Sequence, residues 1–77
     1  GVAKLGRMAV HRVLRGTGVG RSLVSALAQA ARDRGDHCLR LSAQRSAQGF
    51  YQRLGFETVG QPYDDVGIAH IDMQRLL

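Results

Sequence analysis

The 77-residue sequence contains one cysteine, one proline, one lysine and no tryptophan. A lone cysteine, Cys38, cannot form an internal disulfide, which favours a reducing, cytoplasmic setting. No apolar run approaches the ~20 residues of a membrane-spanning helix, and no signal peptide is evident. His11, His37 and His70 lack the spacing of metal ligands. We therefore expect one small globular domain over residues 1–77, with no metal and no membrane partner.

Charge is unevenly distributed along the chain, whose formal net charge is +5. Residues 1–53 carry ten basic and two acidic groups, whereas residues 54–77 carry one basic and four acidic groups. A basic half suits a polyanionic ligand, either a nucleotide cofactor or a nucleic acid. The acidic part suits a cationic partner such as an amine. For the individual arginines, solvated charge without a partner is the alternative.

The stretch from Arg15 to Arg21 combines three alternating glycines with two flanking arginines. Glycines leave backbone N–H groups uncovered, and a helix that begins here adds its first-turn N–H groups and the positive end of its dipole. Such an arrangement binds a phosphate or pyrophosphate. The Walker loop and the dinucleotide-binding fingerprint are both absent. A tight strand-to-helix turn without a ligand is the alternative.

Hydrophobic periodicity predicts alternating strands and helices. The first strand, helix and second strand form a β-α-β unit, which we expect to be parallel and right-handed. The last two strands can pair antiparallel across a loop over residues 60–67. The predicted elements are a strand over residues 5–10, a helix over 19–34 that Gly35 ends, a strand over 38–43, a helix that Ser46 caps and Gly55 ends, and strands over 56–59 and 68–76.

Three stretches resemble the GNAT superfamily of acyl-CoA N-acyltransferases. Arg15, Gly18 and Gly20 match Arg/Gln-x-x-Gly-x-Gly/Ala, and residues 47–56 match Ala-x-x-Phe-Tyr-x-x-x-Gly-Phe at the expected distance. Residues 63–73 are similar to the Tyr-x-x-x-Gly-Ile-x-His-Ile-x-Met ending of the ElaA-like branch. The resemblance implies an α/β (α+β) fold, the C-terminal half of a GNAT-like domain with β-α-β-α-β-β order and a mixed sheet.

The activity that this resemblance implies is transfer of an acetyl group from acetyl-CoA to an amine of a small molecule or peptide. By the family pattern, Tyr51 would protonate the departing thiolate, and the backbone N–H of Met8 would stabilise the oxyanion. Tyr51 also lies on the apolar stripe of its helix, so a packing role is the alternative. Gln44 could replace an asparagine that often contacts the cofactor. The other residues implied in CoA binding are Val10, Arg15, Gly16, Gly18, Val19, Gly20 and Arg21.

Two further interpretations compete with the enzyme: a CoA-binding fragment without turnover, and, less favoured, a small basic nucleic-acid-binding domain. Family domains normally supply several strands and two helices before the strand predicted at residues 5–10. That strand would lack one neighbour, and an unpaired edge invites pairing. We therefore expect a homodimer or association with a separate N-terminal piece. His70, with Asp64 and Asp65, could take part in amine binding or proton removal; a strand histidine bonded to its neighbours is the alternative.

Overall fold

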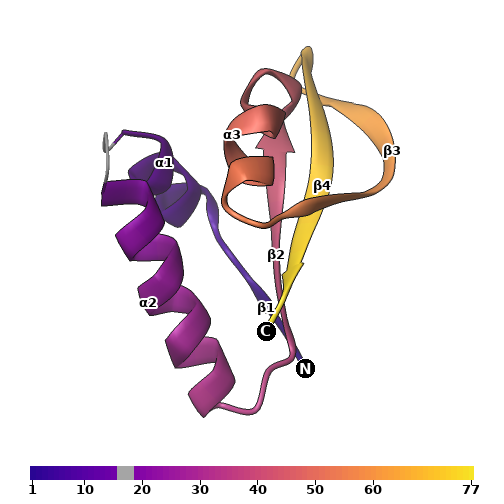
Figure 1. The fold of residues 1–77 in the computed structure, drawn as a ribbon. Helices are drawn as coiled ribbons and strands as arrows, with labels where there is room; N and C mark the ends of the chain where they lie inside the picture. Colours follow the sequence, from indigo (N-terminus) through magenta and orange to yellow (C-terminus); the bar gives the residue numbers. More distant parts are fainter. Residues whose placement is uncertain (16–18) are drawn as a thin grey trace.

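The computed structural model describes residues 1–15 and 19–77 as a four-stranded mixed sheet with helices packed against it (Figure 1). The strand order is β1-β2-β4-β3, with β1 parallel to β2 and the other two pairs antiparallel. The expected mixed α/β fold is confirmed. The elements are β1 (Val2–Lys4), α1 (Arg7–Arg15), α2 (Val19–Asp33), β2 (Cys38–Gln44), a 3-10 turn (Arg45–Ala47), α3 (Gln48–Arg53), β3 (Glu57–Asp65) and β4 (Ile68–Leu76).

The prediction of a strand over residues 5–10 is wrong. The first strand is β1, and the chain enters α1 at Arg7. Within α1 the Val10 N–H donates to the Gly6 carbonyl at 3.0 Å. Val10 packs against the core and Val13 is fully buried in it, and this three-residue spacing is that of one helix face. A short apolar run does not distinguish the two structures by periodicity alone.

The hairpin at the end of the chain also differs from expectation. The prediction of a loop over residues 60–67 is wrong, because residues 60–65 extend β3, with a shift of register between Val59 and Tyr63. Only Val66 and Gly67 form the turn, and both have positive φ, 52° and 76°. Two left-handed residues fit the right-handed twist of a two-residue hairpin. The turn is therefore much tighter than the sequence suggested.

The helix ends agree with the sequence better than the helix starts. Gly35 and Gly55 follow α2 and α3 with φ of 88° and 92°, the left-handed conformation that ends a helix. Ser46, expected to cap α3, lies instead in the 3-10 turn, and Ala47 stands at the N-cap without a side-chain bond. None of the helices within the described residues has the length and apolarity needed to cross a membrane.

The core lies between the helices and one face of the sheet. Every second residue of β2 and β4 faces the helices, whereas the alternate residues form the opposite, mostly polar face. Tyr51 of α3 is the largest fully buried side chain. The buried cluster consists of Val13, Val24, Ala28, Ala31, Leu39, Leu41, Ala43, Tyr51, Phe56, Ile71 and Met73.

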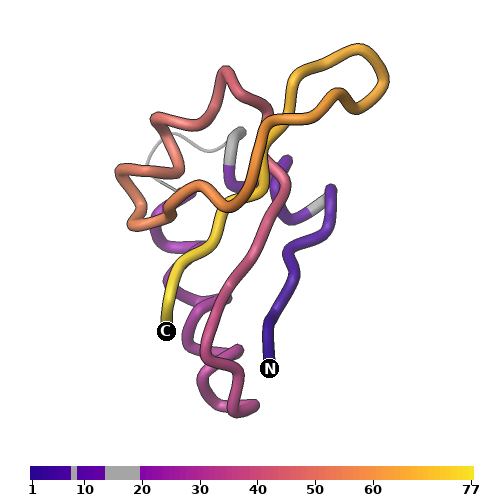
Figure 2. The backbone as a smooth tube through the Cα atoms, turned by 90° about the vertical axis from the view of Figure 1, so that its right-hand side faces the viewer, coloured from indigo at the N-terminus to yellow at the C-terminus, as the bar shows by residue number. Residues whose placement is uncertain are grey.

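Both chain ends lie at the same end of the sheet (Figures 1 and 2). The N–H of His37 donates to the Gly1 carbonyl at 3.0 Å, and the N–H of Leu77 donates to the His37 carbonyl at 3.0 Å. One residue therefore joins the edge strand β1 to the end of β4. The opposite end of the sheet, where β2 reaches Gln44, borders the cavity described below.

Gly20 is buried where α2 packs against α1. A Cβ atom placed there would lie 2.6 Å from the Val13 carbonyl oxygen and 3.2 Å from Phe50 Cζ. The first neighbour is a backbone atom, so a side chain cannot be accommodated without moving one helix. Glycine at this position therefore has a packing reason that is independent of any phosphate.

We predict that Gly20→Ala lowers the free energy of unfolding by about 1–3 kcal/mol, the usual cost of overpacking. Gly49→Ala is the matched control, because a Cβ at this exposed helical glycine meets nothing within 4 Å and alanine favours a helix. Urea unfolding of both variants provides the comparison. Equal stability of Gly20→Ala and the unmodified chain would contradict the close approach of α1 and α2.

Candidate functional site

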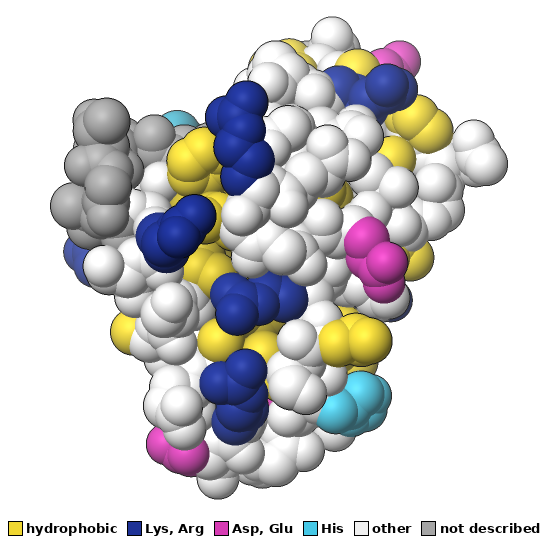
Figure 3. Space-filling view, in the orientation of Figure 1, with side chains coloured by type: hydrophobic (Ala, Val, Ile, Leu, Met, Phe, Trp, Pro, Cys, Tyr) yellow, Lys and Arg dark blue, Asp and Glu magenta, His cyan; other side chains and the backbone are white. Residues whose placement is uncertain are grey.

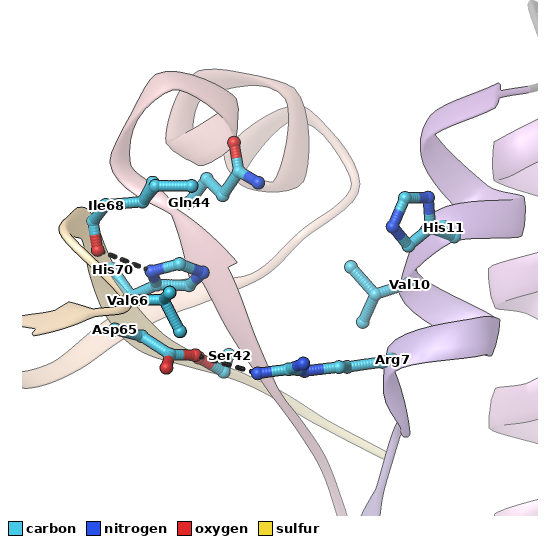
Figure 4. Close-up of a pocket in the computed structure, with 9 residues that line it drawn as sticks. All are labelled: Arg7, Val10, His11, Ser42, Gln44, Asp65, Val66, Ile68 and His70. Carbon is cyan, nitrogen blue, oxygen red and sulfur yellow. Dashed lines mark hydrogen bonds and ion pairs between the residues drawn. The ribbon is translucent and has the colours of Figure 1, made fainter.

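A cavity of about 350 Å³ opens where β1 and β2 part (Figure 4). β1 ends at Lys4, which pairs with Arg40, whereas β2 continues to Gln44. The chain after β1 turns away into α1, so the cavity lies between α1 and the far ends of β2 and β4. Its lining consists of Arg7, Val10, His11, Ser42, Gln44, Asp65, Val66, Ile68 and His70.

An ion pair crosses this cavity from α1 to β3. Arg7 Nη2 lies 3.2 Å from Asp65 Oδ2, and Figure 4 shows the arginine reaching from α1 toward the hairpin. The Arg7 side chain is 82% exposed, so the pair contributes little to stability and another cation can compete for the carboxylate. Asp65 therefore provides an anionic position in the cavity wall.

The face of the sheet opposite the helices carries a connected set of polar side chains beside this cavity. The Tyr63 hydroxyl donates to Asp72 Oδ1 at 2.7 Å and bonds to the Ser42 hydroxyl. The bond with Ser42 lowers the pKa of Tyr63, whereas the bond to Asp72, burial and the charges of Asp72 and Asp65 raise it, and the net shift is upward. The hydroxyl therefore stays protonated, which fixes the ring on which His70 stacks at a centroid distance of 6.1 Å.

The residues implied in CoA binding fall into several places. Gly16 and Gly18 lie outside the described residues, as do the side chains of Met8, Arg15 and Val19. Val10 and Gln44 face the same cavity from opposite walls. Gly20 packs against α1, and Arg21 lines a second hollow rather than the cavity.

The backbone of α1 differs from the strand on which the implied pantetheine contacts depend. Met8 lies in the first turn of α1, and the Val10 N–H already donates within the helix. In this conformation Val10 offers an apolar wall to the cavity, whereas its amide is not available to a ligand.

The second hollow, of about 360 Å³, lies between α2 and the end of α3. Three arginines line it, Arg21 from α2, Arg53 from α3 and Arg75 from β4, and no acidic residue does. None of the three forms an ion pair with an acidic side chain in the described part of the chain. Figure 3 shows a column of basic side chains on this face, with an acidic side chain near its lower end. We call this hollow the arginine hollow.

Sequence reasoning singled out Arg21 but missed Arg53 and Arg75. Arg75 lies over Gly55, with its Cδ and Nε 3.6 Å from where a Cβ of that glycine would be. The only signal in the sequence was the overall excess of arginine, because the three residues come together from three separate elements. Their convergence creates a positive site at the first turn of α2, where Arg21 lies.

Tyr51 is fully buried in the core, with ring centroids 5.3 Å from Phe50 and 5.8 Å from Phe56. The packing role is therefore confirmed. Its hydroxyl has no hydrogen-bond partner among the described residues, and burial raises the pKa of Tyr51 to about 12. A buried polar group left without a partner costs about 1–3 kcal/mol, so such a group invites a functional explanation.

Two other residue types carry little chemistry here. Cys38 is a buried free thiol, and a free cysteine of this kind behaves as a small hydrophobic residue. No group of three or more histidine, cysteine, aspartate or glutamate side chains in the described ranges could hold a metal ion.

The chain belongs to the acetyltransferase (GNAT) domain family, whose sequence model matches residues 2–77. Protein ElaA of Escherichia coli is 40% identical over 72 residues, which cover 92% of this chain and 47% of ElaA. The resemblance drawn from the sequence is thus confirmed. The chain spans about half the length of the curated relatives that it matches.

Solved structures agree on the fold. A candidate N-acetyltransferase from Lactobacillus plantarum has a TM-score of 0.83 and 31% identity, covering 99% of this chain and 52% of that one. An acyl-CoA N-acyltransferase from Pseudomonas aeruginosa has a TM-score of 0.67 and 42% identity, covering 79% of this chain and 42% of that one. The sheet and helices described above are therefore those of an acyltransferase domain.

We predict that alkali destabilises the chain partly through Tyr51. Its pKa is about 12 in the folded state against the ordinary 10.0, so the unfolded chain loses this proton first. The stabilisation is complete below pH 10 and is lost as the pH rises toward 12, by roughly 3 kcal/mol in total.

Tyr51→Phe should therefore lose less stability than the unmodified chain between pH 9 and 11.5, as measured by urea unfolding. At neutral pH the variant should be as stable or slightly more stable, because it lacks a buried hydroxyl without a partner. If the free energy of unfolding fell equally with pH in the two proteins, this result would show that the Tyr51 hydroxyl is not buried as described.

Proposed function

We propose that this chain carries the cofactor site of an N-acetyltransferase, which moves an acetyl group from acetyl-CoA to an amine of a small molecule or peptide. The observation that carries this proposal is the arginine hollow, which adjoins the first turn of α2. Arginine binds phosphate oxygens in a bidentate manner, and CoA carries a pyrophosphate and a 3′-phosphate. The family to which the chain belongs and its acyl-CoA-dependent structural neighbour support the same cofactor.

In this proposal the glycine-rich loop holds the pyrophosphate. Its backbone N–H groups, those of Gly16, Gly18, Val19 and Gly20, together with Arg15, would bind the phosphate oxygens as helix N-termini do. Arg21 lines the same hollow as Arg53 and Arg75, so we assign it to the 3′-phosphate side of the cofactor. Gln44 and the wall formed by Val10 would flank the pantetheine arm, with the Met8 N–H as oxyanion donor.

Bound acetyl-CoA supplies a thioester whose carbonyl carbon accepts the amine. The chain's own contribution at the leaving sulfur is the Tyr51 hydroxyl. Its pKa of about 12 lies well above the ordinary pKa of an alkyl thiol, near 8.5, so complete proton transfer to the thiolate is uphill. We propose that Tyr51 acts by donating a hydrogen bond to the developing negative charge, which also gives the buried hydroxyl a partner.

Because the chain spans about half of its relatives, CoA binding without turnover is the second candidate function. β1 forms one edge of the sheet, and a second copy or a separate N-terminal piece would pair there. We propose this association and a cytoplasmic location. Nucleic-acid binding is not favoured, because Tyr51 and Phe56 are buried in the core and Phe50 packs against it.

We predict that CoA shifts the backbone amide resonances of residues 16–21 in a two-dimensional NMR titration. Smaller shifts are expected at Val10, at Gln44 and at the arginine hollow. Shifts in this pattern would support the cofactor site and separate it from turnover, which needs an amine screen. Unchanged spectra at millimolar CoA would contradict the proposal for this chain.

We further predict that the double variant Arg53→Gln/Arg75→Gln weakens CoA binding by roughly tenfold or more, given that hydrogen bonds to charged groups contribute about 1.5–3 kcal/mol. Dephospho-CoA, which lacks the 3′-phosphate, should bind the variant and the unmodified chain almost equally. Isothermal titration calorimetry with both ligands measures the difference.

Arg32→Gln is a control for the loss of a single positive charge outside the hollow, because Arg32 is exposed at the end of α2 and does not line the hollow. It should change the affinity for CoA only slightly. If the double variant lost equal affinity for CoA and for dephospho-CoA, this result would contradict the assignment of the 3′-phosphate to the arginine hollow.

A further inference from the structure

His70 occupies a defined position at the junction of the cavity and the polar face. It lies on the central strand β4, paired with Gln44 of β2 on one side and Tyr63 of β3 on the other. Its ring stacks on Tyr63 with an interplanar angle of 25°, and it lines the cavity with Ser42 and Gln44. A side chain held on both sides by strands is more rigid than one on a loop.

One hydrogen bond fixes which nitrogen of this ring carries the proton. His70 Nδ1 lies 2.8 Å from the Ile68 carbonyl oxygen. A carbonyl oxygen can only accept, so Nδ1 must be the donor, and in the neutral ring Nε2 keeps its lone pair. Figure 4 shows this second nitrogen on the side of the ring that faces α1 across the cavity. The cavity therefore has a proton acceptor in its wall.

The charges around the ring suit a cationic substrate. The groups that share the cavity with His70 are Arg7 and His11 from α1 and Asp65 from β3, and the Tyr63 hydroxyl lies beside it with Asp72. Arg7 already occupies Asp65 with a guanidinium, which shows that a cation fits there. An alkylammonium group can displace this exposed pair and reach Nε2 in the same space.

We propose that His70 is the group that accepts the proton from the amine substrate, an inference that rests on the acetyl transfer proposed above. The alkylammonium ion gives one proton to Nε2 and becomes the neutral amine. The amine lone pair forms the new C–N bond at the thioester carbonyl carbon, and the C–S bond breaks with its electron pair on sulfur. The second nitrogen proton leaves as the amide forms, and the thiolate takes up a proton. The imidazolium then returns its proton to solvent.

The first test needs no turnover. Long-range ¹H–¹⁵N spectra of the ¹⁵N-labelled chain at pH 8 report the protonation of each ring nitrogen. We expect Nδ1–H and a bare Nε2 at His70, and we expect n-butylamine to shift the Nε2 resonance. An Nε2–H tautomer, or an Nε2 resonance that n-butylamine leaves unmoved, would overturn the proposal. The CoA titration reports separately on the cofactor site, so failure of the two proposals is distinguishable.

The second test is kinetic. His70→Ala should lower kcat by about 100-fold or more, the usual contribution of a positioned base, while the KM for acetyl-CoA and the unfolding temperature stay unchanged. Added imidazole should restore much of the lost rate, because it can occupy the vacated space. His70→Gln keeps a polar side chain of similar length and should be equally slow.

His37→Ala is the control, because this exposed histidine lies at the opposite end of the sheet, where its ring contacts only the N-terminal nitrogen of Gly1, at 3.5 Å, among the described residues. Its kcat should equal that of the unmodified chain. A His70→Ala variant that keeps its rate within threefold, or one whose lost rate imidazole does not restore, would show that His70 has a structural role only.

Discussion

The parting of β1 from β2 is the constraint on which the candidate site depends. The two strands pair only as far as Lys4 and Arg40, with one more bond from the Leu5 N–H to the Arg40 carbonyl. Beyond that point β2 continues alone on this side, because the chain enters α1 with its apolar face toward the core. The cavity and the ion pair across it follow from this separation, and His70 borders the cavity from β4.

The two faces of the sheet provide different environments, one apolar and one polar. The helix-covered face buries the apolar residues of β2 and β4. Tyr51 is buried against this face, and its hydroxyl has no hydrogen-bond partner among the described residues. The opposite face carries Ser42, Tyr63 and Asp72 in one hydrogen-bonded chain. The alternation of side chains along a strand produces both environments from the same few residues, so the chemistry of the site and the stability of the core are coupled through β2 and β4.

Gly20 illustrates how one residue can satisfy two requirements. The sequence pattern assigned it to a phosphate-binding loop, whereas the structure gives it a close contact with the Val13 carbonyl. Conversely, the arginine hollow arises from residues that no short motif connects. Arg21, Arg53 and Arg75 lie on three elements, and their positive charge becomes a site only because α2, α3 and β4 border the same hollow.

The sequence was enough to predict the family, the course of α2 and β4, and the glycines that end α2 and α3, because helical periodicity, strand alternation and left-handed glycines are local properties. It did not determine whether residues 5–10 form a strand or a helix, since this short apolar run satisfies both and only packing against the core decides. It also could not place Val66 and Gly67 in a tight turn, bring Arg53 and Arg75 to Arg21, or fix the His70 ring against the Ile68 carbonyl. These features depend on strand register and on distances between segments, which only the tertiary structure sets.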